Sequence, residues 1–382
     1  MRTFGAYVHV PFCSSRCGYC DFNTYTASEL QRDGTSVSVA TYASQLVSEI
    51  ELVRQIQLPE ARGIDTVFFG GGTPTLLPAQ DLIRILQSLD SNYGLSKVAE
   101  VTVEANPDSV DQQYLSELRA GGVSRISFGH QSSAPAVLKL LERTHTSGRT
   151  WQAIKWAKAV GFEHISVDLI YGSPNETDED LQLTLNEVAE SDVDHVSAYS
   201  LIVEPGTRLA QQVAKGVVPM PSDDVAARRY ELIDSFLTER GFQWYEVSNW
   251  AKEGGECQHN LGYWHNHDWL GFGPGAHAHM NGVRSWNVKH PASWAAQLAQ
   301  STLPIAGNEQ LGMEEIAREE VMLGLRLREG IPTSLLVEGV VNQLPMLVNE
   351  GLIAADQLKS ERIVLTSRGR LLADGIITRL WA

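Results

Sequence analysis

Short runs of β-forming residues alternate with amphipathic stretches over residues 6–247, and this alternation constrains the fold more than any other feature of the chain. Such a pattern is typical of parallel strands joined by crossover helices. Six units of this kind predict an α/β protein with a partial (β/α)6 barrel. The expected strands are 6–10, 66–69, 101–104, 125–128, 164–169 and 195–201.

The stretch 41–56 illustrates the helical half of the pattern. Its apolar residues Tyr42, Leu46, Ile50 and Val53 recur at the spacing of one helix face. Residues with this spacing face the sheet, so we assign them to the core and not to a functional site.

The composition changes after Val247. Six of the nine tryptophans lie between Trp244 and Trp294, and five histidines lie between His259 and His279. Helical patterns return from about residue 301 and surround a β-like run, ERIVLT. The chain is therefore expected to comprise a barrel over 1–248, a His- and Trp-rich connecting segment over 249–300 and a smaller winged-helix-like domain over 301–382.

The composition also limits the class of partner. With 43% hydrophobic and 20% charged residues, the 382-residue chain is apolar enough to bury a sizeable core. A formal charge of −16 opposes binding to nucleic acid and to anionic membranes. No apolar run approaches the roughly 20 residues that span a bilayer, and the start, MRTFGAYVHV, lacks the regions of a signal peptide. We expect a cytoplasmic protein whose partners are small molecules or proteins.

Three of the four cysteines, Cys13, Cys17 and Cys20, lie within eight positions directly after the first expected strand. In a reducing compartment this spacing indicates a metal centre rather than disulfides. A [4Fe-4S] cubane has four irons, so three thiolates leave one iron open. The open iron can chelate an amine and a carboxylate, as the methionine part of S-adenosylmethionine offers. A structural zinc site, with His9 or Asp21 as fourth ligand, and three unrelated core cysteines are the alternatives.

Polar and glycine residues at the ends of the next strands suit a nucleotide-like ligand. Residues 70–74 read GGGTP after the strand TVFF, and consecutive glycines let the backbone approach a ligand and donate N–H groups. Glu104 ends the next strand and could pair with an ammonium, while Asp168 ends a later strand and could accept ribose hydroxyls. Taken singly, the glycines could form an ordinary turn and each acid could be a helix cap.

Several motifs of the chain resemble those of a known enzyme family. The stretches YVHVPFCSSRCGYCDF and FFGGGTPT resemble the radical S-adenosylmethionine (radical SAM) enzymes, specifically the oxygen-independent coproporphyrinogen III oxidase group. Further segments extend the likeness over nearly the whole chain: VEANPDS, RISFGHQS, LERTHT, VDLIYGSP, YSLIVEPGT and GFGPGAH. The resemblance implies a radical SAM barrel that binds a [4Fe-4S] cluster and S-adenosylmethionine.

Within that group the chain is most similar to the HemW heme chaperones. The oxidase motif continues to a further cysteine where this chain has Phe22, and the oxidase carries a long N-terminal extension where only six residues precede Tyr7 here. Residues 259–264, HNLGYW, match the HNxxYW segment of HemW proteins. Phe22 and the short stretch before Tyr7 both argue against decarboxylation of coproporphyrinogen.

The resemblance also assigns roles to individual residues. Cys13, Cys17 and Cys20 would bind the cluster, and the adenosylmethionine contacts would come from nine positions along the barrel. Tyr7 and Tyr19 would lie against the cluster and its ligand. Gly71, Gly72 and Thr73 would contact the methionine part, and Glu104 its ammonium. Gln131, Arg143 and Asp168 would contact the carboxylate and ribose.

For heme, the resemblance implicates His259, flanked by Tyr263 and Trp264, because histidine is a common ligand of heme iron. A polar turn residue is the plain alternative for His259. The nearby His265, His267, His277 and His279 leave the identity of any iron ligand open.

Three functional hypotheses follow. The first is a chaperone that binds heme and delivers it to apoproteins, with a second copy of the chain and membrane proteins as further candidate partners and no nucleic acid. The alternative is an oxygen-independent coproporphyrinogen III oxidase that makes protoporphyrinogen IX by radical decarboxylation. The third is an iron-sulfur scaffold without adenosylmethionine chemistry.

Overall fold

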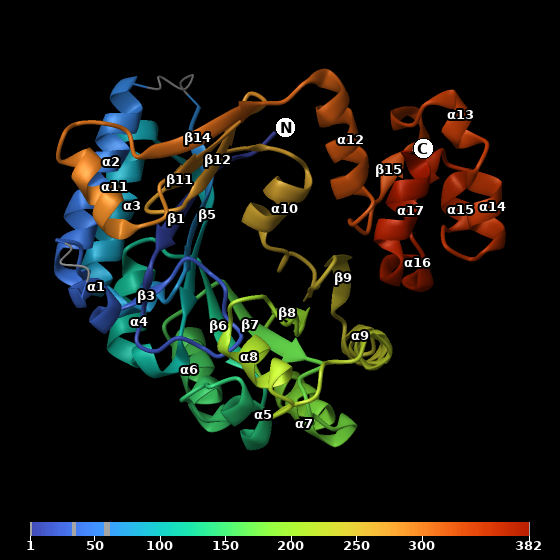
Figure 1. Ribbon diagram of the computed structural model, residues 1–382, viewed down its shortest axis with the longest axis horizontal. Coiled ribbons are helices and arrows are strands. Elements are labelled where there is room, and N and C mark those ends of the chain that lie inside the picture. Colours follow the sequence, from blue (N-terminus) through green and yellow to red (C-terminus); the bar gives the residue numbers. More distant parts are fainter. Residues whose placement is uncertain (1, 33–35, 57–61, 382) are drawn as a thin grey trace.

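In the computed structural model, which describes residues 2–32, 36–56 and 62–381, the expected parallel strands form the centre of one large sheet (Figure 1). They follow one another in chain order, and each neighbouring pair is parallel. This confirms the α/β class and the six strands of the partial barrel. The strands are β1 (Phe4–Val10), β4 (Ile64–Gly71), β5 (Leu95–Ala105), β6 (Arg125–Gln131), β7 (His164–Tyr171) and β8 (His195–Ser200).

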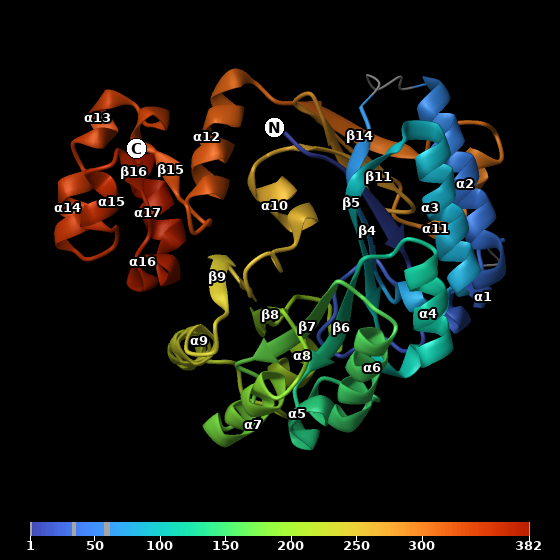
Figure 2. The same cartoon turned by 180° about the vertical axis from the view of Figure 1, so that it is seen from behind.

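Helices cover the outer face of these strands, and the inner face is concave (Figures 1 and 2). The covering helices are α2 (Val39–Ile56), α3 (Ala79–Tyr93), α4 (Gln112–Ala120), α6 (Ser147–Ala159) and α7 (Asp178–Ala189). In α2, the four residues assigned to the core from their spacing are all buried. Within the described ranges, no helix has the length and apolar character needed to cross a bilayer.

The His- and Trp-rich segment extends both edges of the sheet. At one edge, β10 (Asn249–Ala251) pairs with β8 and with β9 (Gln243–Glu246), both antiparallel. At the other edge, β11 (Asp268–Phe272) pairs parallel with β1, and β12 (His277–Met280), β13 (Val283–Asn287) and β14 (Ile305–Gln310) continue antiparallel. Between the two edges, α10 (Gln258–Trp264) crosses the open side of the partial barrel (Figure 1). The parts expected as 1–248 and 249–300 therefore share one sheet.

Residues beyond β14 form helices around a two-stranded antiparallel sheet of β15 (Ile331–Pro332) and β16 (Arg362–Ile363). Their apolar side chains build a core of their own, separate from that of the barrel. The helices are α12 (Met313–Gly324), α13 (Glu338–Val341), α14 (Leu344–Asn349), α15 (Ala355–Leu358), α16 (Ser367–Leu371) and α17 (Ala373–Leu380). Arg370 joins this region to the barrel, with Nη1 3.2 Å from Asp234 Oδ2 and its guanidinium over the Trp244 ring.

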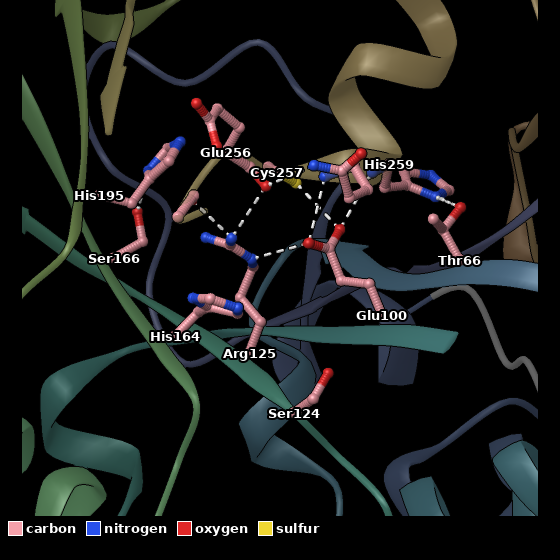
Figure 3. Close-up of polar contacts among 12 residues, drawn as sticks. Thr66, Glu100, Ser124, Arg125, His164, Ser166, His195, Glu256, Cys257 and His259 are labelled. Atoms are coloured by element: carbon pink, nitrogen blue, oxygen red, sulfur yellow. Dashed lines mark hydrogen bonds and ion pairs between the residues drawn. The ribbon is translucent and has the colours of Figure 1, made fainter. Parts of the chain in front are cut away.

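A buried ion pair at the amino ends of the strands fixes the start of α10 (Figure 3). Arg125 on β6 donates from Nε to Glu100 on β5 at 3.1 Å, and both side chains are buried. The Glu100 carboxylate also accepts the backbone N–H groups of Gln258 and His259 at 3.1 and 3.0 Å. It thereby satisfies two amide donors that every helix start leaves open. Arg125 Nη2 donates to the Gly255 carbonyl at 2.6 Å, so both charged groups hold the same turn.

We expect Arg125→Met to destabilise the protein by about 3 to 5 kcal/mol, because the Glu100 carboxylate would remain buried without its cation. Urea unfolding followed by circular dichroism measures this change. The control is Arg318→Met, which breaks an exposed pair with Glu314 one helical turn away in α12 and should cost at most about 0.5 kcal/mol. Equal losses in the two variants would contradict the role given to the buried pair.

Candidate functional site

The cysteine loop leaves β1 at the carboxyl end of the strand, the end at which parallel α/β folds gather their ligands. Cys13 ends the short strand β2 (Phe12–Cys13), which pairs with β3 (Tyr25–Thr26), and the loop between them presents Cys17 and Cys20. The Cys20 N–H donates to the Cys17 carbonyl at 3.2 Å. All three thiols are partly exposed, whereas Cys257 is buried.

The surroundings of the thiols disfavour a thiolate charge that no cation balances. Burial raises the pKa of Cys20 to about 11, and the neighbouring Cys17 and Cys13 add to the shift. Burial also raises the pKa of Cys13, although hydrogen bonds from Thr24 and Thr73 act in the opposite direction. Bound iron would replace these protons, because thiolates are its ligands. In the described part of the chain, no three His, Cys, Asp or Glu side chains are arranged to hold a single ion.

The glycine run closes tightly onto the cysteine loop. At Gly71, where φ is +110°, a Cβ would lie 2.5 Å from the His9 ring, and at Gly72 it would lie 2.4 Å from the Phe12 carbonyl oxygen. Only glycine fits at these two positions. The Gly72 and Thr73 N–H groups donate to the Val10 and Phe12 carbonyls at 2.8 and 2.7 Å.

These bonds correct one expectation about the run. The Gly71 N–H donates to Glu104 Oε2 at 3.1 Å, so the N–H groups of Gly71, Gly72 and Thr73 all have partners within the protein. They are used to join the ends of β1 and β4 and are not available to a ligand. What the run can offer a bound ammonium is its carbonyl oxygens.

Glu104 and Asp168 are brought together on the concave face. Burial, reinforced by the charge of Asp168, raises the pKa of Glu104 to about 8. Burial raises the pKa of Asp168 to about 6, opposed by hydrogen bonds from Ser197 and Ser127. The Ser127 hydroxyl lies 3.1 Å from Asp168 Oδ1. A cationic ligand between these two half-buried carboxyl groups would stabilise their charged forms.

Arg143 and Tyr19 lie beside Cys17 on the other side. Arg143 Nη2 donates to the Gly129 carbonyl at 2.7 Å, and its Nη1 lies 3.6 Å from Cys17 Sγ. Its Nε is buried with no hydrogen-bond partner among the described residues. Gln131 has φ of +67° at a break in the register between β6 and β7. Arg143 thus has one buried N–H group without a protein partner, and an oxygen-rich ligand could satisfy it.

Tyr7 connects the cysteine loop with the interior of the barrel. Its hydroxyl lies 3.0 Å from His9 Nδ1, and His9 Nε2 lies 3.0 Å from the Asn23 carbonyl oxygen. The Tyr7 ring stacks on Phe68 of β4. The predicted cluster and adenosylmethionine residues therefore gather at one end of the sheet.

His259 lies apart from that group, on α10. Its Nδ1 is 2.8 Å from Thr66 Oγ1 and its Nε2 is 2.7 Å from the Tyr263 hydroxyl. The ring stacks on Phe68, is 2% exposed, and has a pKa that burial lowers to about 3. His259 is thus neither a turn residue nor, in this conformation, a free donor to iron.

Two cavities lie between the concave face and α12. One, of about 520 Å³, is lined from β1, β11, β12, β13, α10 and α12, and the other, of about 360 Å³, lies beside Tyr199 and Glu246. Tyr263 and Leu323 line both. Sequence reasoning did not find the walls of the larger cavity, because residues such as Trp269, Arg284 and Met322 belong to distant elements and to no common motif.

Comparison with known proteins agrees with this geometry. A model of the radical SAM superfamily matches residues 7–188, and one of the HemN C-terminal domain matches residues 312–372. The solved structure of the coproporphyrinogen III oxidase HemN from Escherichia coli superposes with a TM-score of 0.84, covering 99% of this chain and 90% of that one, at 24% identity. The fold and the matched regions define a radical SAM protein with a HemN-type C-terminal domain.

Relatives that match over the full length narrow this radical SAM class to one family. A protein of Mycobacterium tuberculosis named heme chaperone HemW is 46% identical over 379 residues, which cover 99% of this chain and 95% of the relative. A protein of the same name from Bacillus subtilis is 34% identical, with 97% of each chain covered. The chain belongs to the HemW family.

For the cluster, we expect anaerobically reconstituted protein to contain about four irons and four sulfides per chain. Replacing any one of Cys13, Cys17 and Cys20 by Ala should abolish this content, because two thiolates cannot hold a cubane that already lacks one protein ligand. Iron and sulfide analysis with the absorption spectrum measures the effect. Cys257→Ala is the matched control and should keep the cluster, and the reverse pattern would refute the assignment.

Proposed function

We propose that this chain binds heme and delivers it to apoproteins, and that it carries a [4Fe-4S] cluster and S-adenosylmethionine. The observation that carries the proposal is the 46% identity over 99% of the chain to a protein named heme chaperone HemW. The segment 259–264 supports it, as does Phe22, which is 66% exposed at the position where the oxidase motif has a further cysteine.

The residues at the carboxyl ends of the strands fit the two cofactors. Cys13, Cys17 and Cys20 would hold the cluster, which with bound S-adenosylmethionine supplies reductive cleavage chemistry in this superfamily. Glu104 would meet the ligand's ammonium, because its half-buried carboxyl group forms no ion pair among the described residues. Asp168 would accept ribose hydroxyls.

The remaining contacts follow from the same arrangement. Arg143 would donate to the ligand's carboxylate through the Nε that has no protein partner. Gly71, Gly72 and Thr73 would shape the floor of the site, while Tyr7 and Tyr19 would shield the cluster from water. The half-buried acids and the packed glycines would set this geometry before any ligand binds.

The larger cavity is suited to heme in size and composition. Ligand pockets for small molecules span about 300 to 1,000 Å³ and are lined mainly by apolar and aromatic side chains. The cavity of about 520 Å³ has Tyr7, Tyr263 and Trp269 among its walls, together with Met322 and Leu323. Heme in this cavity would lie beside Tyr7 and so next to the proposed adenosylmethionine site, where one ligand could influence the other.

The coproporphyrinogen oxidase remains the second candidate function, because the fold follows HemN over nearly its whole length. We expect no protoporphyrinogen from purified protein supplied anaerobically with coproporphyrinogen III, S-adenosylmethionine and reductant. The ground is Phe22 at the position of the oxidase's further cysteine. Turnover above that of the cluster-free Cys13→Ala variant would overturn the chaperone proposal.

Glu104→Ala and Asp168→Ala should each weaken S-adenosylmethionine binding by about 1.5 to 3 kcal/mol, the range for hydrogen bonds to charged groups. Glu104→Gln should also weaken binding although it retains an oxygen for the Gly71 N–H, because it removes the negative charge. Isothermal titration of cluster-loaded protein measures the change. The control is Asp178→Ala, a surface acid on α7. Unchanged dissociation constants for Glu104 and Asp168 variants would reduce both residues to structural roles.

A further inference from the structure

Histidine nitrogen is a common ligand of heme iron and needs a free lone pair to bind it. Among the histidines near the larger cavity, several are paired or lie outside its lining. The ring nitrogens of His259 are both hydrogen-bonded, as are those of His9. His279 is 4% exposed and does not line the cavity. His267 is hydrogen-bonded through Nδ1 to Thr3 and also lies outside the lining.

His277 differs from all of these. It lies on β12, its side chain is exposed, and it lines the cavity of about 520 Å³. Among the described residues neither of its ring nitrogens has a hydrogen-bond partner. The strand holds the ring in place through pairing with β13, where Trp286 stacks against it with 6.0 Å between ring centroids. His277 is thus an imidazole that stacks on Trp286 and whose ring nitrogens are unpaired among the described residues.

The surroundings keep this imidazole in the form that binds metal. Partial burial lowers the pKa of His277, and the nearby Lys289 lowers it further. The ring is therefore neutral at physiological pH, and neutral imidazole is the ligating species. Trp269 shares the same cavity and donates from Nε1 to the His277 carbonyl at 3.0 Å, which fixes the backbone beneath the ring.

We propose that His277 is the residue that ligates the iron of heme in the larger cavity, and that His259 acts on heme only through Tyr263. The proposal rests on the heme-binding function proposed above and specifies its site. The Tyr263 ring forms part of the cavity wall, and its hydroxyl is held 2.7 Å from His259 Nε2. His259 is a positioning residue because it orients this wall and anchors α10 to Thr66.

The test is a heme titration of the cluster-loaded protein followed by its absorption spectrum. Wild-type protein should shift the Soret band. His277→Ala should lose at least tenfold in heme affinity and show a changed band, and added imidazole should restore the wild-type spectrum because it replaces the missing ligand. His277→Met should bind heme with a different spectrum, since a thioether replaces the nitrogen. Cluster content and circular dichroism confirm that the exposed site folds in both variants.

Two further variants separate ligation from positioning. His259→Ala and Tyr263→Phe should weaken heme binding to a similar degree, and imidazole should restore neither. His164→Ala, a partly exposed histidine at the start of β7, is the control and should bind heme as the wild type does. A wild-type spectrum and affinity in His277→Ala, or imidazole rescue of His259→Ala, would overturn the assignment of His277. Absence of heme binding by the wild type would instead refute the proposed function itself.

Discussion

The position of α10, and with it the shape of both cavities, depends on the Glu100 carboxylate. It lies at the amino ends of the strands, where it accepts hydrogen bonds from Arg125 and from the first two amides of α10. The seven-residue α10 has little else to hold it, since His259 is its one fully buried side chain and packs on Phe68 and Thr66. Because α10 carries Tyr263, the walls of both cavities depend on a carboxylate at the opposite end of the barrel from the cysteines.

The sequence was sufficient to predict the central fold. Each barrel strand is a local apolar run, and the cysteine loop and glycine run are short motifs, so their identity needs no knowledge of distant residues. The prediction for the glycines was wrong in one respect. Their N–H groups bind the neighbouring chain instead of a ligand, because the parallel ends of β1 and β4 must be joined where regular pairing stops.

The environment of His259 could not be predicted in the same way. Its hydrogen-bond partner Thr66 lies 193 positions away in the chain, and Glu100, which holds its amide, lies 159 positions away. The segment HNLGYW contains polar residues and a glycine, and it reads as a loop until α10 is seen crossing the barrel. The place of His277 in a cavity wall could not be predicted either, because the opposite wall is formed by α12, which is distant in the sequence.

Tyr263 and Leu323 each stand between the two cavities and line both. A wall shared in this way makes the contents of the two spaces thermodynamically dependent, since a ligand that displaces Tyr263 in one changes the shape of the other. Binding free energies are reciprocal, so each occupant must alter the affinity of its neighbour by the same factor. Heme bound in one cavity would then be released when a second ligand fills the other cavity, without any competitor for the heme site itself.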